Sequence, residues 1–237
     1  RSTPLYSSAA SDVYKRQLPE MIRGVNKSKK YHWDLSPESQ HNLCSKLLDE
    51  FGRDKDQVVV GKSPHPFSIT LGPNDYRITT RIVEGEPLSS FLATAHEWGH
   101  SIYEQGLPSQ SHQWFAWPLG QATSMGIHES QSLFWENRIV KSKSFSKRFF
   151  KKFVSAGCTL NNYFELWKSI NHLEAGLNRV EADELTYGLH ILVRTELEID
   201  LIEGGLPAED IPEEWNKRYG ELLGIKPSND SEGCLQD

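Results

Sequence analysis

Apolar positions recur at helical spacing along most of this chain. Between residues 35 and 51, a Ser-Pro start precedes apolar residues spaced for one face of a helix, and Gly52 follows as a natural stop. Similar patterns predict helices over residues 87–106, 122–140, 145–158, 161–174, 180–203 and 213–223. Glycine and proline residues between these segments are typical of helix boundaries. The pattern therefore predicts a mainly α-helical protein.

One segment alternates in a way that favours strands. Residues 67–83 read FSITLGPNDYRITTRIV, in which two β-rich stretches flank a Gly-Pro-Asn-Asp connection with turn chemistry. This pattern predicts one β hairpin. The expected fold is mainly α, with one small hairpin or sheet beside the helices.

Residues 1–17 show no period and are rich in serine and small residues. We expect them to be a non-native or disordered tail. Residues 18–237 contain no internal repeat and no low-complexity tract, so we expect them to belong to a single domain.

Composition excludes several classes of function. With 37% hydrophobic and 24% charged residues and no apolar run of bilayer length, the chain indicates a globular protein without a membrane span. A net charge of −6 supplies no basic field for nucleic acid or anionic lipid. Three well-separated cysteines suggest neither a disulfide framework nor a cysteine zinc site, which favours a cytoplasmic location.

The pentapeptide HEWGH, residues 96–100, lies within the predicted helix 87–106. His96 and His100 are one turn apart, so both imidazoles can reach one divalent ion. Glu97 lies roughly 100° around the helix, where a general base beside that ion would stand. The alternative is that both histidines are ordinary core or surface residues.

Two histidines leave a catalytic zinc site short of a ligand, because such sites usually have three protein ligands. Glu129 is the best candidate, since it lies among apolar neighbours in the next strong helical segment and a buried carboxylate needs a partner. A solvent-exposed helix carboxylate is the alternative for Glu129. The neighbouring His128 is either a structural hydrogen-bonding group or a substrate contact.

Six ordered motifs together resemble the M32 family of metallocarboxypeptidases. They are HPF at 65–67, DYRIT at 75–79, HEWGH at 96–100, HESQ at 128–131, NRVEAD at 178–183 and GCLQD at 233–237. The similarity extends from about Leu18 to the end of the chain. The family pattern has a long helical part before this region and a His-Trp pair after the last motif, so we expect the C-terminal portion of a catalytic peptidase domain, truncated at both ends.

The resemblance implies that His96, His100 and Glu129 bind the metal and that Glu97 is the catalytic base. It also implies a zinc-dependent enzyme, with cobalt as a possible substitute, that releases single amino acids from the C-termini of peptides through a metal-activated water. A homodimer is implied for the full-length protein. An inactive metal-binding fragment, or a related zinc dipeptidyl- or oligopeptidase, is the alternative function.

A carboxypeptidase must recognise a free carboxylate, and the planar fork of arginine suits this task. We expect Arg179 to do so, on a polar stripe that also carries Asp183 and His190 along the predicted helix 180–203. A surface ion pair between Arg179 and Asp183 is the alternative. Arg77, from the hairpin, is the second candidate for binding the substrate carboxylate.

Overall fold

The computed structural model describes residues 5–25, 30–108, 111, 113–115 and 117–236. Contacts between residues divide the chain into two compact units. We call Tyr31–Ile170 the central unit, and Arg1–Lys30 together with Asn171–Asp237 the terminal unit. No helix in the described part of the chain combines the length and apolar composition needed to cross a bilayer.

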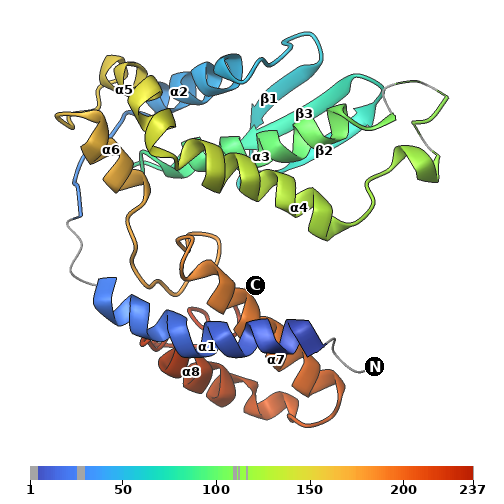
Figure 1. The fold of residues 1–237 in the computed structure, drawn as a ribbon, viewed down its shortest axis with the longest axis vertical. Coiled ribbons are helices and arrows are strands. Elements are labelled where there is room, and N and C mark those ends of the chain that lie inside the picture. Colours follow the sequence, from blue (N-terminus) through green and yellow to red (C-terminus); the bar gives the residue numbers. More distant parts are fainter. Residues whose placement is uncertain (1–4, 26–29, 109–110, 112, 116, 237) are drawn as a thin grey trace. The chain divides into compact units, whose positions relative to one another are not determined.

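The central unit contains helices beside a small sheet (Figure 1). Its elements are α2 (Pro37–Glu50), β1 (Val58–Lys62), β2 (Ser68–Gly72), β3 (Asp75–Thr80), α3 (Ser89–Gln105), η2 (Pro118–Gly120), α4 (Met125–Leu133), η3 (Phe134–Val140), α5 (Lys143–Ser155) and α6 (Tyr163–Ile170). The predicted mainly helical fold is confirmed. The start of α2 shows why the pattern succeeded, because the Ser36 hydroxyl accepts a hydrogen bond from the Ser39 amide and Pro37 occupies the first turn.

The predicted hairpin is formed by β2 and β3, which pair antiparallel. Its turn holds Asn74 at a φ of 62°, a conformation that asparagine tolerates better than most residues. The structure adds β1, which pairs in parallel with β3 and gives the strand order β1-β3-β2. The pattern of the hairpin alone did not predict β1, because its partner is distant in sequence.

Helix α3 lies at the centre of the unit's packing. Phe91 and Ala95 are buried in one core cluster, where Phe91 contacts Phe149 and Phe153 of α5. Trp98 is buried in a second cluster with residues of the sheet. Because α3 packs into both clusters, the helix cannot rotate about its axis. The face of α3 that is not buried in them therefore has a fixed orientation.

The helix predicted over residues 122–140 consists of two consecutive segments with different hydrogen-bond patterns. It runs as an α-helix from Met125 to Leu133 and continues as a π-helix from Phe134 to Val140. Apolar spacing does not distinguish these two hydrogen-bond patterns at this length. The π-helical turns are relevant to function because such segments occur often at functional sites.

The terminal unit consists of α1 (Leu5–Val25), α7 (Tyr187–Ile202), η4 (Ala208–Asp210) and α8 (Ile211–Leu222). Leu18 and Ile22 of α1 are buried with Leu189 and Val193 of α7 and with Trp215 of α8. Residues 5–17 lie in α1, so they are helical and the expectation of disorder is wrong for them. Their non-native origin stays a prediction. The serine-rich first half of α1 has no apolar period, so the sequence pattern did not predict a helix there. The buried residues described for α1, Leu18 and Ile22, lie in its second half.

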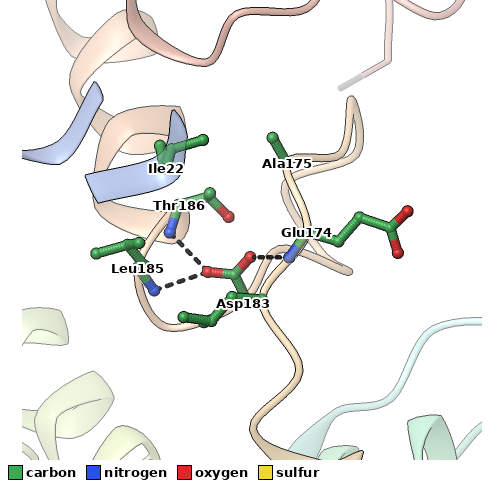
Figure 2. Close-up of a pocket in the computed structure, with 7 residues that line it drawn as sticks. Ile22, Glu174, Ala175, Asp183, Leu185 and Thr186 are labelled. Atoms are coloured by element: carbon green, nitrogen blue, oxygen red, sulfur yellow. Dashed lines mark hydrogen bonds between the residues drawn. The ribbon is translucent and has the colours of Figure 1, made fainter. Parts of the chain in front are cut away.

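The helix predicted over 180–203 also differs from the structure. Helix α7 begins only at Tyr187, so Arg179 and Asp183 precede it and cannot share a helical stripe with His190. The Asp183 carboxylate accepts hydrogen bonds from the backbone amides of Leu185 and Thr186, and from that of Glu174 (Figure 2). By accepting these hydrogen bonds, the Asp183 side chain stabilises the turn that precedes α7. The cavity beside it, about 10 Å³, has room for no more than one water molecule.

Candidate metal centre

Two imidazoles face the same region from one turn of α3. His96 and His100 lie at positions i and i+4, with ring centroids 4.9 Å apart. Both side chains retain partial solvent exposure, 23% for His96 and 14% for His100. The opposite face of α3 is buried in the core, so the helix presents these two rings toward a solvent-accessible point.

Glu129 reaches that point from α4. One of its carboxylate oxygens lies 3.7 Å from His96 Nε2 and 3.4 Å from His100 Nε2. The three donor atoms lie within 4.8 Å of one another. The sequence-predicted ligands are therefore brought together by the fold.

Gly99 allows the two helices to approach this closely. A Cβ atom at this position would lie 2.5 Å from Ser132 Cα and 2.6 Å from the Gln131 carbonyl oxygen, both backbone atoms of α4. A side chain there would force the helices apart. The glycine within HEWGH thus sets the distance between the histidines and Glu129.

This donor set suits a zinc ion. Two ligands about 2.0–2.1 Å from a tetrahedral ion are separated by about 3.3 Å, close to the observed distances between histidine nitrogen and glutamate oxygen. Two histidines and one carboxylate are also a known ligand set for catalytic zinc, with a fourth position left for water or substrate. The residues present therefore fit a bound metal ion.

Each histidine has a partner on its other ring nitrogen. His96 Nδ1 lies 3.0 Å from a carboxylate oxygen of Glu136, whose other oxygen is 3.3 Å from Lys141 Nζ. His100 Nδ1 lies 2.6 Å from His128 Nδ1, and His128 Nε2 lies 2.7 Å from a Glu104 oxygen. The partner on Nδ1 thus orients each ring so that its Nε2 is directed toward Glu129.

Glu97 lies between the two histidines on α3 and is only 7% exposed. Burial raises its pKa above the ordinary value, although the nearby His96 and His100 act in the opposite direction. A carboxylate with a raised pKa binds a proton more strongly than an exposed one. This property suits a general base that works near neutral pH.

The pKa values of Glu129 and Glu136 move in the opposite direction. The pKa of Glu129 is lowered, chiefly by its hydrogen bond with His100. Burial would raise the pKa of Glu136, but the hydrogen bond with His96 and the charge of Lys141 outweigh it and the pKa falls. These two carboxylates therefore stay ionised beside the histidines while Glu97 holds a proton more readily.

The predicted ligands of the substrate carboxylate are two arginines, Arg77 and Arg179. Arg77 forms an ion pair of 3.0 Å with Asp75 at the exposed surface of β3. Arg179 belongs to the terminal unit, in the loop before α7. The structure does not bring Arg77 into the cluster of His96, His100 and Glu129. The roles of both arginines in substrate binding stay predictions.

The sequence pattern did not single out Glu104 and Glu136. Glu104 follows His100 by one helical turn, so its position on the same face of α3 could have been noticed. Glu136 follows Glu129 by seven residues, or two turns, but its approach to His96 depends on the π-helical part of this segment. Of these two residues, only Glu136 could not have been identified without the tertiary structure.

A mainly helical protein in which HExxH on one helix converges with a carboxylate from another has the fold and site of a metallopeptidase. The chain belongs to the carboxypeptidase Taq (M32) metallopeptidase family, whose sequence pattern matches residues 8–237.

Individual relatives agree with this assignment. The chain is 43% identical over 210 residues to Thermostable carboxypeptidase 1 of Thermus thermophilus, which covers 87% of this chain and 40% of that protein. It is 40% identical over 206 residues to Carboxypeptidase 1 of Bacillus subtilis, covering 84% of this chain and 40% of the relative. The chain thus spans about 40% of the length of these relatives.

A solved structure supports the fold independently. Trypanosoma cruzi metallocarboxypeptidase 1 superimposes with a TM-score of 0.89 at 31% identity, and the match covers all of this chain and 50% of the other.

Proposed function

We propose that this chain carries the catalytic centre of a zinc-dependent carboxypeptidase that releases single amino acids from the C-termini of peptides. The observation that supports this most directly is the convergence of His96, His100 and Glu129 around one point, with the buried Glu97 on the same helix. Membership of the M32 family supplies the reaction class.

In this proposal, His96, His100 and Glu129 hold one divalent ion, zinc first and cobalt as a substitute. A bound zinc ion would polarise the scissile carbonyl and lower the pKa of its water toward ~7. Glu97 accepts the proton from the attacking water and passes it to the leaving amine. The raised pKa of Glu97 supports the first transfer, because burial increases its affinity for a proton.

Arg179 is proposed to bind the C-terminal carboxylate of the peptide, as a bidentate donor. Arg77 is the second candidate, although its ion pair with Asp75 already occupies part of its donor fork. In an active preparation, Arg179→Ala should reduce the preference for free over amidated peptides, with Arg77→Ala as the matched comparison. If the preference for free over amidated peptides is unchanged in Arg179→Ala and reduced in Arg77→Ala, then Arg77 and not Arg179 binds the carboxylate.

Further expectations concern the whole protein. We propose that it is a cytoplasmic homodimer acting on peptides. The three free thiols Cys44, Cys158 and Cys234 suit a reducing compartment. Sedimentation of the full-length protein tests the dimer, and cell fractionation tests the compartment.

The first experiment is the metal content of the purified chain beside a His96→Ala control. One zinc per chain, lost in the control, is the expected result. Absence of bound zinc in the unaltered chain would contradict the proposed centre for this chain. Peptides with free and amidated C-termini then separate a carboxypeptidase from a zinc endopeptidase, because only the carboxypeptidase loses the amidated substrate.

A further inference from the structure

The ring nitrogen of His100 that points away from Glu129, Nδ1, contacts another histidine, whereas Nδ1 of His96 contacts a carboxylate. His100 Nδ1 and His128 Nδ1 are 2.6 Å apart, and the second nitrogen of His128 is 2.7 Å from Glu104. All three side chains are mostly buried, with exposed fractions of 14% for His100, 16% for His128 and 21% for Glu104. These residues form a continuous chain of hydrogen bonds.

The positions of the hydrogen atoms in this chain follow from the carboxylate at its end. Glu104 accepts a hydrogen bond as a carboxylate, so His128 must carry its hydrogen on Nε2. His128 Nδ1 is then an acceptor, and His100 must donate from Nδ1. With zinc bound, a neutral His100 that keeps its hydrogen on Nδ1 has a lone pair on Nε2, the nitrogen that lies 3.4 Å from Glu129. That lone pair is what a metal ion requires. In the metal-free chain that nitrogen donates to Glu129 instead.

The opposite arrangement is incompatible with metal binding. Hydrogen on His128 Nδ1 would point at His100 Nδ1, which would then have to accept it. A neutral His100 would carry its own hydrogen on Nε2, and no lone pair would face the ion. The nitrogen of His128 that carries the hydrogen therefore decides whether His100 can act as a ligand.

Two helices supply the residues of this hydrogen-bonded chain. Glu104 lies one turn beyond His100 on α3, while His128 comes from α4 beside Glu129. The Tyr103 ring, 5.1 Å from the His128 ring, packs against it at a steep angle. The hydrogen-bonded chain thus links the two helices that supply the three metal-facing groups.

We propose that Glu104 and His128 form a relay that fixes the tautomer and orientation of His100, so that His128 is a positioning residue and not a substrate contact. This inference rests on the proposed metal centre. Glu136 holds His96 directly, which provides a comparison within the same site. Removing such supporting groups typically weakens metal affinity by about 10–100-fold.

The test measures the zinc dissociation constant of the 237-residue chain by competition with a chelator. His128→Leu removes the acceptor behind His100 and should weaken zinc binding by about 10–100-fold. His128→Asn places an amide oxygen near the position of the original Nδ1, so it should restore most of the affinity. His32→Leu, which removes an exposed histidine of the central unit, is the matched control and should bind zinc like the unaltered chain.

Glu104→Gln is the second variant, because it preserves shape and is the safer choice if His128→Leu fails to fold. The loss of charge should weaken zinc binding by about tenfold. Glu86→Gln, an exposed carboxylate outside the relay, should leave it unchanged. Long-range ¹H–¹⁵N spectra of the zinc-loaded chain should show hydrogen on His100 Nδ1 and on His128 Nε2.

The outcomes separate this inference from the proposed function. If the unaltered chain binds zinc but His128→Leu and Glu104→Gln bind it equally well, the relay is wrong and the metal centre stands. Hydrogen on His128 Nδ1 would also overturn the relay. If the unaltered chain binds no zinc, the metal centre and the relay both fail.

Discussion

At the scale of single residues, burial and hydrogen bonding give chemically identical side chains different pKa values. Glu97 and Glu129 are both glutamates near the same histidines, yet burial raises the pKa of the first and a hydrogen bond with His100 lowers that of the second. The first is suited to take up a proton, and the second to remain an anionic ligand. The sequence motif predicted both roles, whereas the difference in environment comes from the fold.

Glu97→Gln separates metal binding from proton transfer. The amide keeps the size of the side chain but cannot accept the proton, so turnover in an active preparation should fall at least ~100-fold while zinc is retained. Zinc content and the rate of peptide hydrolysis are measured together, with Glu86→Gln as the control. Retained activity with full zinc occupancy would remove Glu97 from the mechanism.

His190 provides a residue-scale prediction in the terminal unit. It is fully buried, its Nδ1 lies 2.9 Å from the Tyr219 hydroxyl, and burial lowers its pKa from 6.5 to about 4. Between these values the unfolded chain binds a proton that the folded chain does not. Stability is therefore greatest above pH 6.5 and is lost as the pH falls toward 4, by on the order of 3 kcal/mol.

The measurement is the free energy of unfolding of the terminal unit, taken from hydrogen exchange in α7 and α8 between pH 7 and 4. His190→Gln removes the titrating group, so its stability should depend less steeply on pH than that of the unaltered chain. His32→Gln is the control and should retain the original slope. Equal slopes in all three proteins would contradict the assignment.

At the scale of elements, the site depends on how closely α3 and α4 approach. The backbone of α4 lies so close to Gly99 that no Cβ fits between them, and α4 carries both Glu129 and His128. The apolar period predicted both helices. It did not report the distance between them, because that distance depends on a missing side chain and on a partner more than thirty residues away.

Gly99→Ala should therefore impair metal binding although alanine favours helices. Its methyl group would overlap the backbone of α4, and the displaced helix would carry Glu129 away from the histidines. We expect weaker zinc affinity and a loss of stability of about 1–3 kcal/mol. Zinc titration and thermal unfolding measure the two effects.

Gly126→Ala is the matched control on α4. The nearest atom to its new methyl group would be the Ser124 hydroxyl oxygen at 3.9 Å, an ordinary contact. This variant should bind zinc normally and should be at least as stable as the unaltered chain. Normal zinc affinity in Gly99→Ala would show that the close approach is not needed for the site.

At the scale of the whole molecule, the chain forms two units with separate cores. Both ends of the sequence contribute to the terminal unit, since Leu18 and Ile22 of α1 pack with residues of α7 and α8. The region that supplies His96, His100 and Glu129 lies entirely in the central unit. Metal binding and the terminal core can therefore be tested by different substitutions.

Ile22→Ala tests the contribution of α1 to the terminal core. Ile22 is 5% exposed, and the cavity left by its truncation should lower the stability of the terminal unit by about 2–5 kcal/mol. Met21→Ala, at a neighbouring position that is 52% exposed, should have little effect. Hydrogen exchange in α7 and α8 provides the measurement, and equal exchange in both variants would contradict the packing of α1.

The sequence by itself determined the helical class, the hairpin, the family and the group of His96, Glu97, His100 and Glu129. These features depend on local periods or on short motifs, which are read directly from neighbouring positions. Tertiary structure decided the helical state of residues 5–17, the pairing of β1 with β3, the late start of α7, and the placement of Glu136 behind His96. These depend on partners distant in the chain, and contacts of that kind leave no local period in the sequence.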